Sequence, residues 1–225
     1  MVQIDTTKRR PPLGRRAFML AIPLALCGLE LFHPVHFMHD IPAQFFPVAR
    51  WWLTLHVAQL VLFAMMGGVV YTLTAGRVGI AARVSQLGAG VFAVFYNAGD
   101  AVLGIATGIL GLGASQLSPV MQGARAESIA TIFHNPVIGV LYDIGKGGWF
   151  VAILTAAISL FRAGSPRMPL LFLLLSGFML WFFDHPTPYG PIAFGSFFIA
   201  IAWLEVASPR ILMGAERFGK TILTQ

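Results

Sequence analysis

Six long apolar stretches divide this chain of 225 residues and restrict the folds open to it. Crossing a hydrocarbon layer about 30 Å thick takes about 20 residues of helix, and each stretch reaches or approaches that length. Charged residues make up only 11% of the chain, far below the roughly 25% of a typical soluble domain. The stretches are residues 16–32, 51–75, 84–112, 136–161, 168–183 and 192–207. We therefore predict an all-α, polytopic membrane protein in which residues 15–208 form a bundle of six transmembrane helices.

Lysine and arginine residues are distributed unevenly among the segments that join these stretches. Of the 15, all but Arg50, Arg125 and Lys146 lie around the start of the first stretch, after the sixth, or between the second and third or the fourth and fifth. Basic residues mark cytoplasmic loops, so we expect a disordered cytoplasmic tail at residues 1–14 and a second cytoplasmic tail at 209–225. The net charge of +6 then reports orientation in the plasma (cytoplasmic) membrane. The expected partner is the lipid bilayer and not nucleic acid.

All six histidines fall on the opposite, outward side of this predicted topology. They are His33, His36, His39, His56, His134 and His185. Histidine is usually neutral at pH 7, so part of this bias follows from the exclusion of basic residues from outer loops. Most acidic residues share the same side. Together these residues predict a polar site that opens to the outer face.

A Glu-x-x-His sequence at Glu30 and His33 places a carboxylate and an imidazole on one helical face, a spacing used in metal sites of helical bundles. We expect His33, His56 and His185 to be metal ligands, with Glu30 or Asp143 as a further ligand or the general base. Imidazole combined with carboxylate suits zinc or non-haem iron. The methionine in the His-Phe-Met-His sequence that follows leaves copper as the softer alternative.

Polar side chains inside the apolar stretches are costly in a membrane and often mark functional sites. Asn97 and Asp100 lie three residues apart in the third stretch, and Lys146 lies in the fourth. At about 1.5 Å per residue, Asp100 and Lys146 both fall on the order of 15 Å from the outer ends. Matching depth predicts an ion pair that locks two helices, or alternatively part of a proton or ion relay. Gln59 shares a helical face with His56 and completes the expected polar pocket.

Residues 119–133, between the third and fourth stretches, predict a short amphipathic helix on the outer surface. Ser118 and Pro119 suit the N-cap and the first helical position. A loop packed over the bundle is the alternative interpretation. A second cap is expected at Asn135, immediately before the fourth stretch.

Glycines are frequent in the third and fourth stretches. They are Gly99, Gly104, Gly108 and Gly111 in the third, and Gly139, Gly145, Gly147 and Gly148 in the fourth. Small residues allow membrane helices to approach closely. We therefore expect these two helices to pack tightly.

The favoured hypothesis is that a metal-activated water hydrolyses a lipid-type substrate in an outward-facing pocket, with residues 119–133 as a lid. Two other classes stay open. One is a proton- or ion-coupled transporter that uses Asp100, Asp143 and Lys146. The other is a non-catalytic membrane subunit or assembly factor. The sequence contains no glycine-rich phosphate loop, no Gly-x-Ser-x-Gly and no His-Glu-x-x-His, so it predicts the place of the site more firmly than its reaction.

Overall fold

The computed structural model describes residues 12–34 and 40–207, and every regular element in them is a helix. The elements are α1 (Leu13–Glu30), η1 (Ile41–Phe45), η2 (Phe46–Val48), α2 (Ala49–Thr74), α3 (Ile80–Val91), η3 (Phe92–Tyr96), α4 (Asn97–Asp100), η4 (Ala101–Ala106), α5 (Thr107–Gly111), η5 (Ala114–Gln116), α6 (Pro119–Phe133), α7 (Pro136–Arg162), α8 (Arg167–Phe183) and α9 (Tyr189–Ala207). Elements α3 to α5 follow one another without a break and form one long helix, α3–α5. The all-α prediction is confirmed for these residues.

Four helical segments are long and apolar enough to cross a membrane. They are Ile41–Thr74, Ile80–Gln116, Pro136–Arg162 and Tyr189–Val206. Helix α8 is apolar but has only 17 residues, and α1 carries Arg15, Arg16 and Glu30 among its 18 residues. The described chain therefore has the helices of a membrane protein, but the predicted count of six spans is not confirmed.

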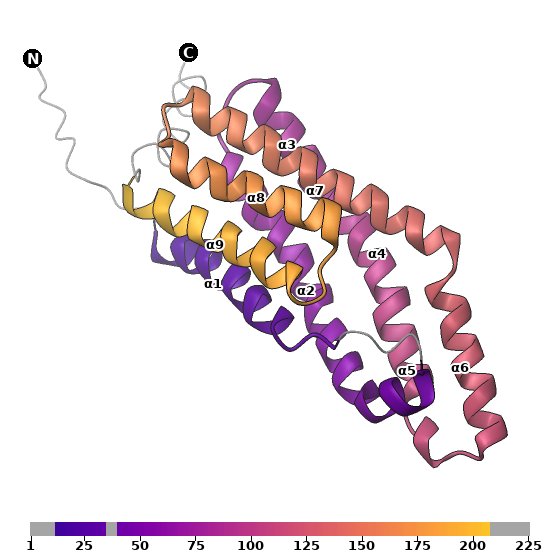
Figure 1. Cartoon of the computed structure of the whole chain (residues 1–225). Helices are drawn as coiled ribbons and strands as arrows, with labels where there is room; N and C mark the ends of the chain where they lie inside the picture. Colours follow the sequence, from indigo (N-terminus) through magenta and orange to yellow (C-terminus); the bar gives the residue numbers. More distant parts are fainter. Residues whose placement is uncertain (1–11, 35–39, 208–225) are drawn as a thin grey trace, which may run out of the picture.

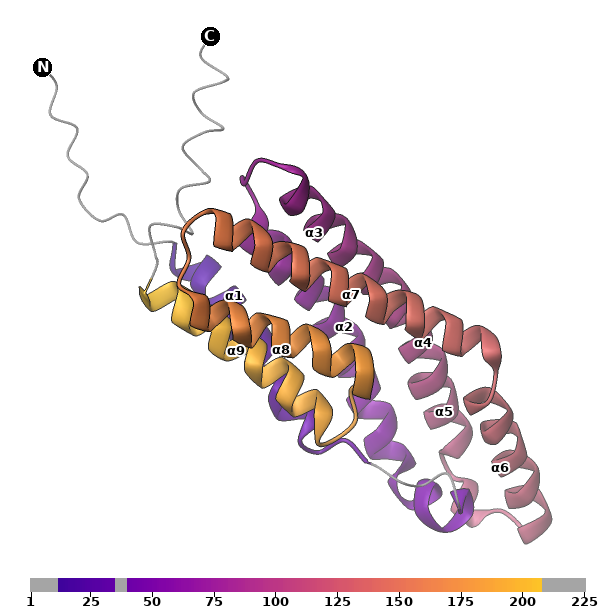
Figure 2. The same ribbon diagram turned by 45° about the horizontal axis from the view of Figure 1, so that its top comes forward.

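The helices form two groups that lie side by side (Figures 1 and 2). Helices α1, α8 and α9 pack together in one group, and α2, α3–α5 and α7 form the other. The start of α1 and the end of α9 lie at the same end of the bundle, where Nη1 of Arg15 is 3.0 Å from Oε1 of Glu205. We call this the terminal end, and the opposite one the histidine end.

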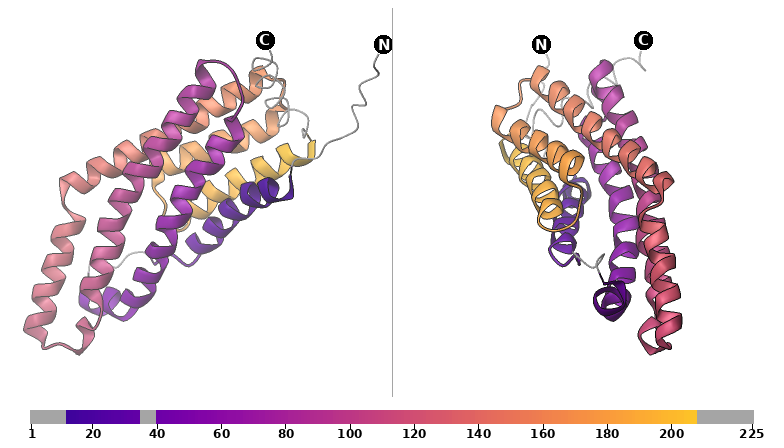
Figure 3. Two further views of the ribbon diagram at one scale, coloured as in Figure 1. Left: turned by 180° about the vertical axis from the view of Figure 1, so that it is seen from behind. Right: turned by 45° about the vertical axis from the view of Figure 1, so that its right-hand side comes forward.

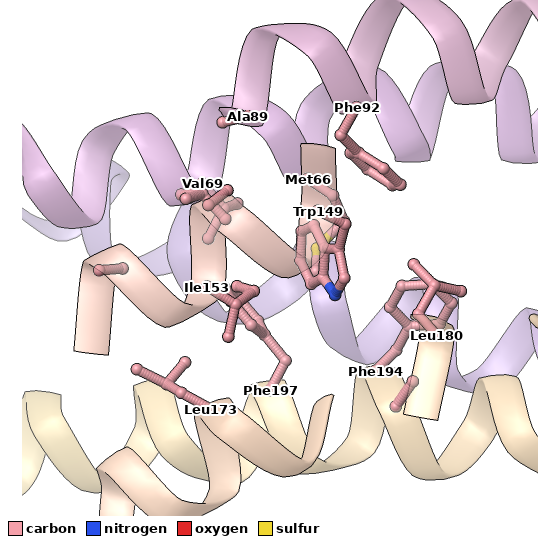
Figure 4. Close-up of a cluster of buried hydrophobic side chains, with 14 of the residues drawn as sticks. Met66, Val69, Ala89, Phe92, Trp149, Ile153, Leu173, Leu180, Phe194 and Phe197 are labelled. Atoms are coloured by element: carbon pink, nitrogen blue, oxygen red, sulfur yellow. The ribbon is translucent and has the colours of Figure 1, made fainter. Parts of the chain in front are cut away.

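The two groups differ in length at the histidine end. The beginning of α2, the end of α3–α5 and helix α6 continue well past the ends of α1 and α8 (Figure 3). We call the protruding elements η1, η2, α5, η5 and α6 the extension. The smaller apolar cluster of the molecule lies there and consists of Ile41, Phe45, Phe46, Ala49, Trp52, Ala114 and Ile129. A larger cluster around Trp149, Phe194 and Phe197 fills the rest of the bundle (Figure 4).

Tight packing between α3–α5 and α7 is confirmed. A Cβ atom on Gly145 of α7 would lie 2.6 Å from the backbone nitrogen of Tyr96, closer than real Cβ contacts allow. Further along the long helix the glycines face α2 instead. A Cβ on Gly108 would lie 2.8 Å from Cβ of Leu53. Glycine thus brings α3–α5 close to two neighbours rather than one.

Residues 119–133 are helical as predicted, but their amphipathic character is not confirmed. Val120 is 83% exposed and Ile129 is fully buried, and their separation of nine positions places these apolar side chains on opposite faces of the helix. The second expected cap does form, because the side-chain oxygen of Asn135 accepts a hydrogen bond from the backbone N–H of Val137 at 2.9 Å.

Candidate metal centre

Three histidines from different elements meet between the two apolar clusters. His33 lies just beyond the end of α1, His56 lies within α2, and His185 lies just beyond the end of α8. One ring nitrogen from each lies within 4.8 Å of those of the other two. His56 packs against Trp52 of the smaller cluster, with ring centroids 4.1 Å apart, and His185 against Phe63 of the larger one, at 5.8 Å. The fold therefore brings together the three residues that the sequence predicts as ligands.

Each of these imidazoles is held through one nitrogen and leaves the other without a partner. In His33 the Nδ1–H donates to the carbonyl of the next residue, and in His56 to a carbonyl one turn earlier, each at 2.8 Å. Nδ1 of His185 lies 2.7 Å from the hydroxyl of Tyr96. All three Nε2 atoms are buried and have no hydrogen-bond partner among the residues that the structure describes. Metal-bound histidines have this arrangement, because an acceptor on one nitrogen fixes the ring and its tautomer.

Asp100 brings a carboxylate to the same place. It is fully buried, and its Oδ1 lies 3.9 Å from Nε2 of His56 and 3.8 Å from Nε2 of His185. The hydroxyl of Tyr142 donates to Oδ1 at 2.9 Å, while Oδ2 has no hydrogen-bond partner. Two ligands of a tetrahedral zinc ion lie about 3.4 Å apart, since each bond is about 2.0–2.1 Å long. We call His33, His56, Asp100 and His185 the histidine layer; its donor set and size approach those of a metal site.

The positive charge of the layer is concentrated on His185, in the loop between α8 and α9. Burial alone lowers the pKa of His185, but the carboxyl groups of Glu30, Asp184 and Asp100 outweigh it and raise the pKa to about 9. In His33, burial and the neighbouring His185 lower the pKa to about 2. The neighbouring carboxyl groups therefore favour the protonated form of His185, and burial keeps His33 neutral with a lone pair available for a cation.

Glu30 is the last residue of α1 and precedes His33 by three residues, about one helical turn. It is fully buried, and Nε2 of Gln59 donates to its Oε1 at 2.6 Å. Oε2 of Glu30 and Oε1 of Gln59 have no hydrogen-bond partner. The hydroxyl of Thr187 donates to the backbone carbonyl of Glu30. Glu30 thus ties α1 to α2 and to the loop that carries His185.

Asp143, Lys146 and Asp184 form a charged rim beside the layer. In place of the expected Asp100–Lys146 ion pair, Nζ of Lys146 lies 3.3 Å from Oδ1 of Asp143 and 3.7 Å from Oδ2 of Asp184. The Asp143 side chain is 72% exposed, so it stands apart from the buried groups. Asp184 connects the rim to the layer through Tyr96. The hydroxyl of Tyr96 donates to Oδ1 of Asp184 at 3.3 Å and also contacts His185.

A cavity of about 670 Å³ opens beside the layer, and the three histidines and the charged rim line it. Its remaining walls are mostly apolar and aromatic: Pro34, Trp52, Leu103, Phe133, Pro136, Ile138, Gly139, Tyr142, Phe183, Pro186 and Tyr189. His134, Asn135 and Thr187 complete the lining. A small molecule in this cavity would therefore reach the histidine side chains through largely apolar surroundings.

Gly104 of η4 makes room for the ring of His56. A Cβ atom at position 104 would lie 1.9 Å from Cδ2 of His56. At Gly190 a Cβ would lie 1.8 Å from the carbonyl oxygen of His185. The glycine predicted to assist helix packing therefore does so against α2, with an imidazole of the histidine layer as the packing partner.

The structure places the other predicted residues outside the layer. Asn97 is nearly buried, and its side-chain N–H donates to a carbonyl one turn earlier at 2.9 Å. His134 is exposed and its Nδ1–H donates to a carbonyl one turn earlier at 2.7 Å. His36, Met38 and His39, the last predicted members of the outward cluster, lie outside the described residues.

Tyr96 and Tyr142, whose hydroxyls contact His185 and Asp100, were not among the predicted site residues. A signal was present, because a buried tyrosine usually finds a partner for its hydroxyl. Tyr96 precedes Asp100 by four residues, about one helical turn, and Tyr142 immediately precedes Asp143. Tyrosines this close to carboxylates in apolar helices indicate members of a polar network.

Comparison with known proteins returns no relative: no family model matches the chain, and no curated protein or solved structure matches it. The observations describe an all-helical protein with membrane-like helices and a buried histidine cluster that could hold a metal ion. Its function has to be inferred from that cluster and its surroundings.

Proposed function

We propose that this protein is a metal-dependent hydrolase of the cytoplasmic membrane that acts on a lipid-type substrate. The observation that carries the proposal is that one ring nitrogen of each of three buried histidines lies within 4.8 Å of those of the other two. Among the described residues, the Nε2 atom of each ring has no hydrogen-bond partner, while each Nδ1 atom is already engaged. Leaving such nitrogens unpaired in a protein interior costs free energy unless a cation binds them. The adjoining cavity supplies room for a substrate.

Three imidazoles and an open position are the ligand arrangement of catalytic zinc sites, and non-haem iron accepts similar ligands. Among the described residues the cluster consists of three histidines, and imidazole ligands suit zinc and iron. A zinc-bound water has its pKa lowered to near 7 and becomes a nucleophile at neutral pH. Hydrolysis is the reaction class that this donor set supports best.

In the proposed reaction, a metal held by His33, His56 and His185 would supply an activated water for attack on the carbonyl carbon of the substrate. Asp100 accepts a proton of that water at Oδ2, the oxygen without a partner, while Tyr142 holds Oδ1. The bond from the carbonyl carbon to the leaving group then breaks, and the leaving group takes the proton from Asp100. Asp100 replaces Glu30 and Asp143 as the proposed base, because it lies closest to the ligand nitrogens.

The proposed orientation places the terminal end in the cytoplasm. Arg15, Arg16, Arg77, Arg83 and Arg162 belong to segments at that end, and basic residues mark cytoplasmic loops. The histidine end then faces outward.

Proton or ion transport has less support from the same observations. Between Glu30 and the terminal end, Glu205 is the only acidic or basic side chain of the described residues that is buried. The larger apolar cluster around Trp149 fills the interior between them. A continuous polar path across the bundle is therefore not part of the proposal.

Metal analysis of the purified protein tests the proposal directly. We expect about one equivalent of zinc or iron per chain, and a loss of most of it in His56→Ala, because three-ligand sites depend on each ligand. His134→Ala is the matched control, since this exposed histidine lies outside the layer. Less than about 0.2 equivalents of any transition metal after metal loading, unchanged by His56→Ala, would refute the metal site.

A further inference from the structure

The position of the histidine layer along the length of the bundle determines which molecules can reach it. Residues 147–161 of α7 and 168–183 of α8 carry no charged side chain. At about 1.5 Å per residue these segments are about 23–24 Å long, which is most of a hydrocarbon layer about 30 Å thick. Both segments end at the charged rim, at Lys146 and Asp184. In α7 and α8 the uncharged segments therefore stop at the level of the layer.

Exposed charges lie beyond this level. Arg50 and Glu127 are exposed in the part of the molecule that includes the extension, and the Asp143 side chain is 72% exposed at the rim. Charged side chains facing hydrocarbon cost several kcal/mol, so these residues belong outside it. The layer then lies at the boundary of the bilayer. The sequence instead predicts that Asp100 and Lys146 lie well inside the hydrocarbon layer, because depth is then counted from the ends of the apolar stretches.

The ends of α1 and α8 form a ledge at this boundary. Both helices stop beside the layer, while α2 and α3–α5 continue into the extension (Figure 3). Exposed aromatic side chains surround the ledge: Phe32, Trp51, Phe182, Phe183 and Tyr189. Aromatic residues favour the membrane–water interface. Phe183 and Tyr189 also line the cavity, so the ledge leads from the lipid headgroup level into the site.

The cavity lining offers no free lysine or arginine side chain to a phosphate. Lys146 is the single lysine or arginine among the lining residues. Its ammonium group is already held between Asp143 and Asp184. Phosphate recognition usually relies on arginine forks or free ammonium groups. The remaining apolar and aromatic walls fit an uncharged acyl group.

We propose that the substrate is an uncharged long-chain ester or amide that reaches the layer over the ends of α1 and α8, with its acyl chain remaining in the adjacent leaflet. The carbonyl carbon meets the metal-bound water, and the products are the fatty acid and the released alcohol or amine. This inference rests on the proposed hydrolysis, and it adds the chemical class of the substrate and its route.

The decisive experiment compares three substrates on the zinc-loaded protein in nanodiscs. They are a dodecanoyl amide of a fluorescent amine, the acetyl amide of the same amine, and a dodecyl phosphomonoester. We expect the dodecanoyl amide to be cleaved at least about tenfold faster than the acetyl amide, with no phosphate released. Faster release of phosphate, or equal rates for the two amides, would overturn the substrate class while leaving metal-dependent hydrolysis intact.

A binding measurement decides the case in which nothing is hydrolysed. With cobalt in the site, dodecanoyl hydroxamate should change the visible absorption spectrum, whereas dodecyl phosphonate of the same chain length should not. A change with the phosphonate alone, or with neither compound, would contradict the inference. Absence of turnover together with the hydroxamate response would reject only the proposed hydrolysis.

The route is tested by narrowing the cavity. Gly139 lines it, and a Cβ atom there meets nothing within 4 Å. Gly139→Trp should keep the metal and reduce binding of the dodecanoyl hydroxamate by about tenfold or more. Gly123→Trp is the control, because this glycine of α6 is also open and does not line the cavity. Equal binding by both variants would refute the route.

Discussion

Two buried carboxylates at opposite ends of the bundle have very different surroundings. Glu205, at the terminal end, lies 3.0 Å from Nη1 of Arg15 and 3.3 Å from Nε of Arg16. Asp100, in the histidine layer, has the hydroxyl of Tyr142 and two imidazole nitrogens at 3.8 and 3.9 Å, and no lysine or arginine of the described residues forms an ion pair with it. The first carboxylate is neutralised by the chain itself.

The difference indicates that the two buried carboxylates have different roles. A buried charge with its own cations, such as Glu205, joins helices; here it ties the start of α1 to the end of α9. A buried carboxylate beside three unpaired Nε2 atoms is an incomplete set of interactions. A metal ion would complete it, because a divalent cation satisfies the imidazoles and the carboxylate together.

Exchanging each carboxylate for its amide gives the largest expected contrast. Asp100→Asn should weaken zinc binding by about 10–100-fold, because it removes the negative charge beside the ligand nitrogens. Glu205→Gln should leave zinc affinity unchanged and lower the unfolding free energy by about 1–3 kcal/mol. Chelator competition and thermal unfolding in detergent measure the two effects. Similar zinc affinity in both variants would remove the distinction between the two ends.

A methyl group at position 104 should perturb the layer without changing any of its charges. Gly104→Ala would drive Cβ into the ring of His56, and overpacking of this kind costs about 1–3 kcal/mol. We expect lower thermal stability and weaker zinc binding together. Gly90→Ala, on the same long helix and in open space, should change neither. Normal zinc affinity in Gly104→Ala would show that the ring position is not needed for binding.

The smallest expected effect comes from the hydroxyl that holds His185. Tyr96→Phe removes the contact at 2.7 Å to Nδ1 and should weaken zinc binding by about tenfold, the lower end for outer partners of a metal ligand. Zinc titration against a competing chelator measures it. Tyr71→Phe, at an exposed position of α2, is the control. Affinity equal to that of the control would mean that Tyr96 does not position the ligand.

The three ligand candidates were predictable because they depend on sidedness and helix ends. His33 and His185 terminate helices at one end of the bundle, and this follows from the basic residues at the other. Asp100 was predicted to belong to the polar pocket, but its contacts with His56, His185 and Tyr142 were not predicted. The π-helical segments η3 and η4 flank it, and a π turn changes the residues per turn, so regular helical spacing does not identify its partners.

The depth of Lys146 in its helix does not by itself predict its ion-pair partners. Asp143 lies three residues before it on the same helix, and Asp184 reaches it from the loop after α8. The six-span count is not confirmed, for a similar reason. The length and charge of α1 and α8 leave them short of a full span, and the apolar sequence does not reveal that these two helices end at a ledge.

The contact between Gly104 and His56 has a consequence for recognising distant relatives. Any side chain at position 104 would occupy the space of the imidazole ring, so the two positions constrain each other although 47 residues separate them. In a divergent chain with this fold, a histidine at the position of His56 in α2 should therefore be accompanied by a glycine at the position of Gly104 in the long helix α3–α5. Loss of the histidine would release the glycine to vary. This linked pair offers a search criterion that overall similarity does not supply.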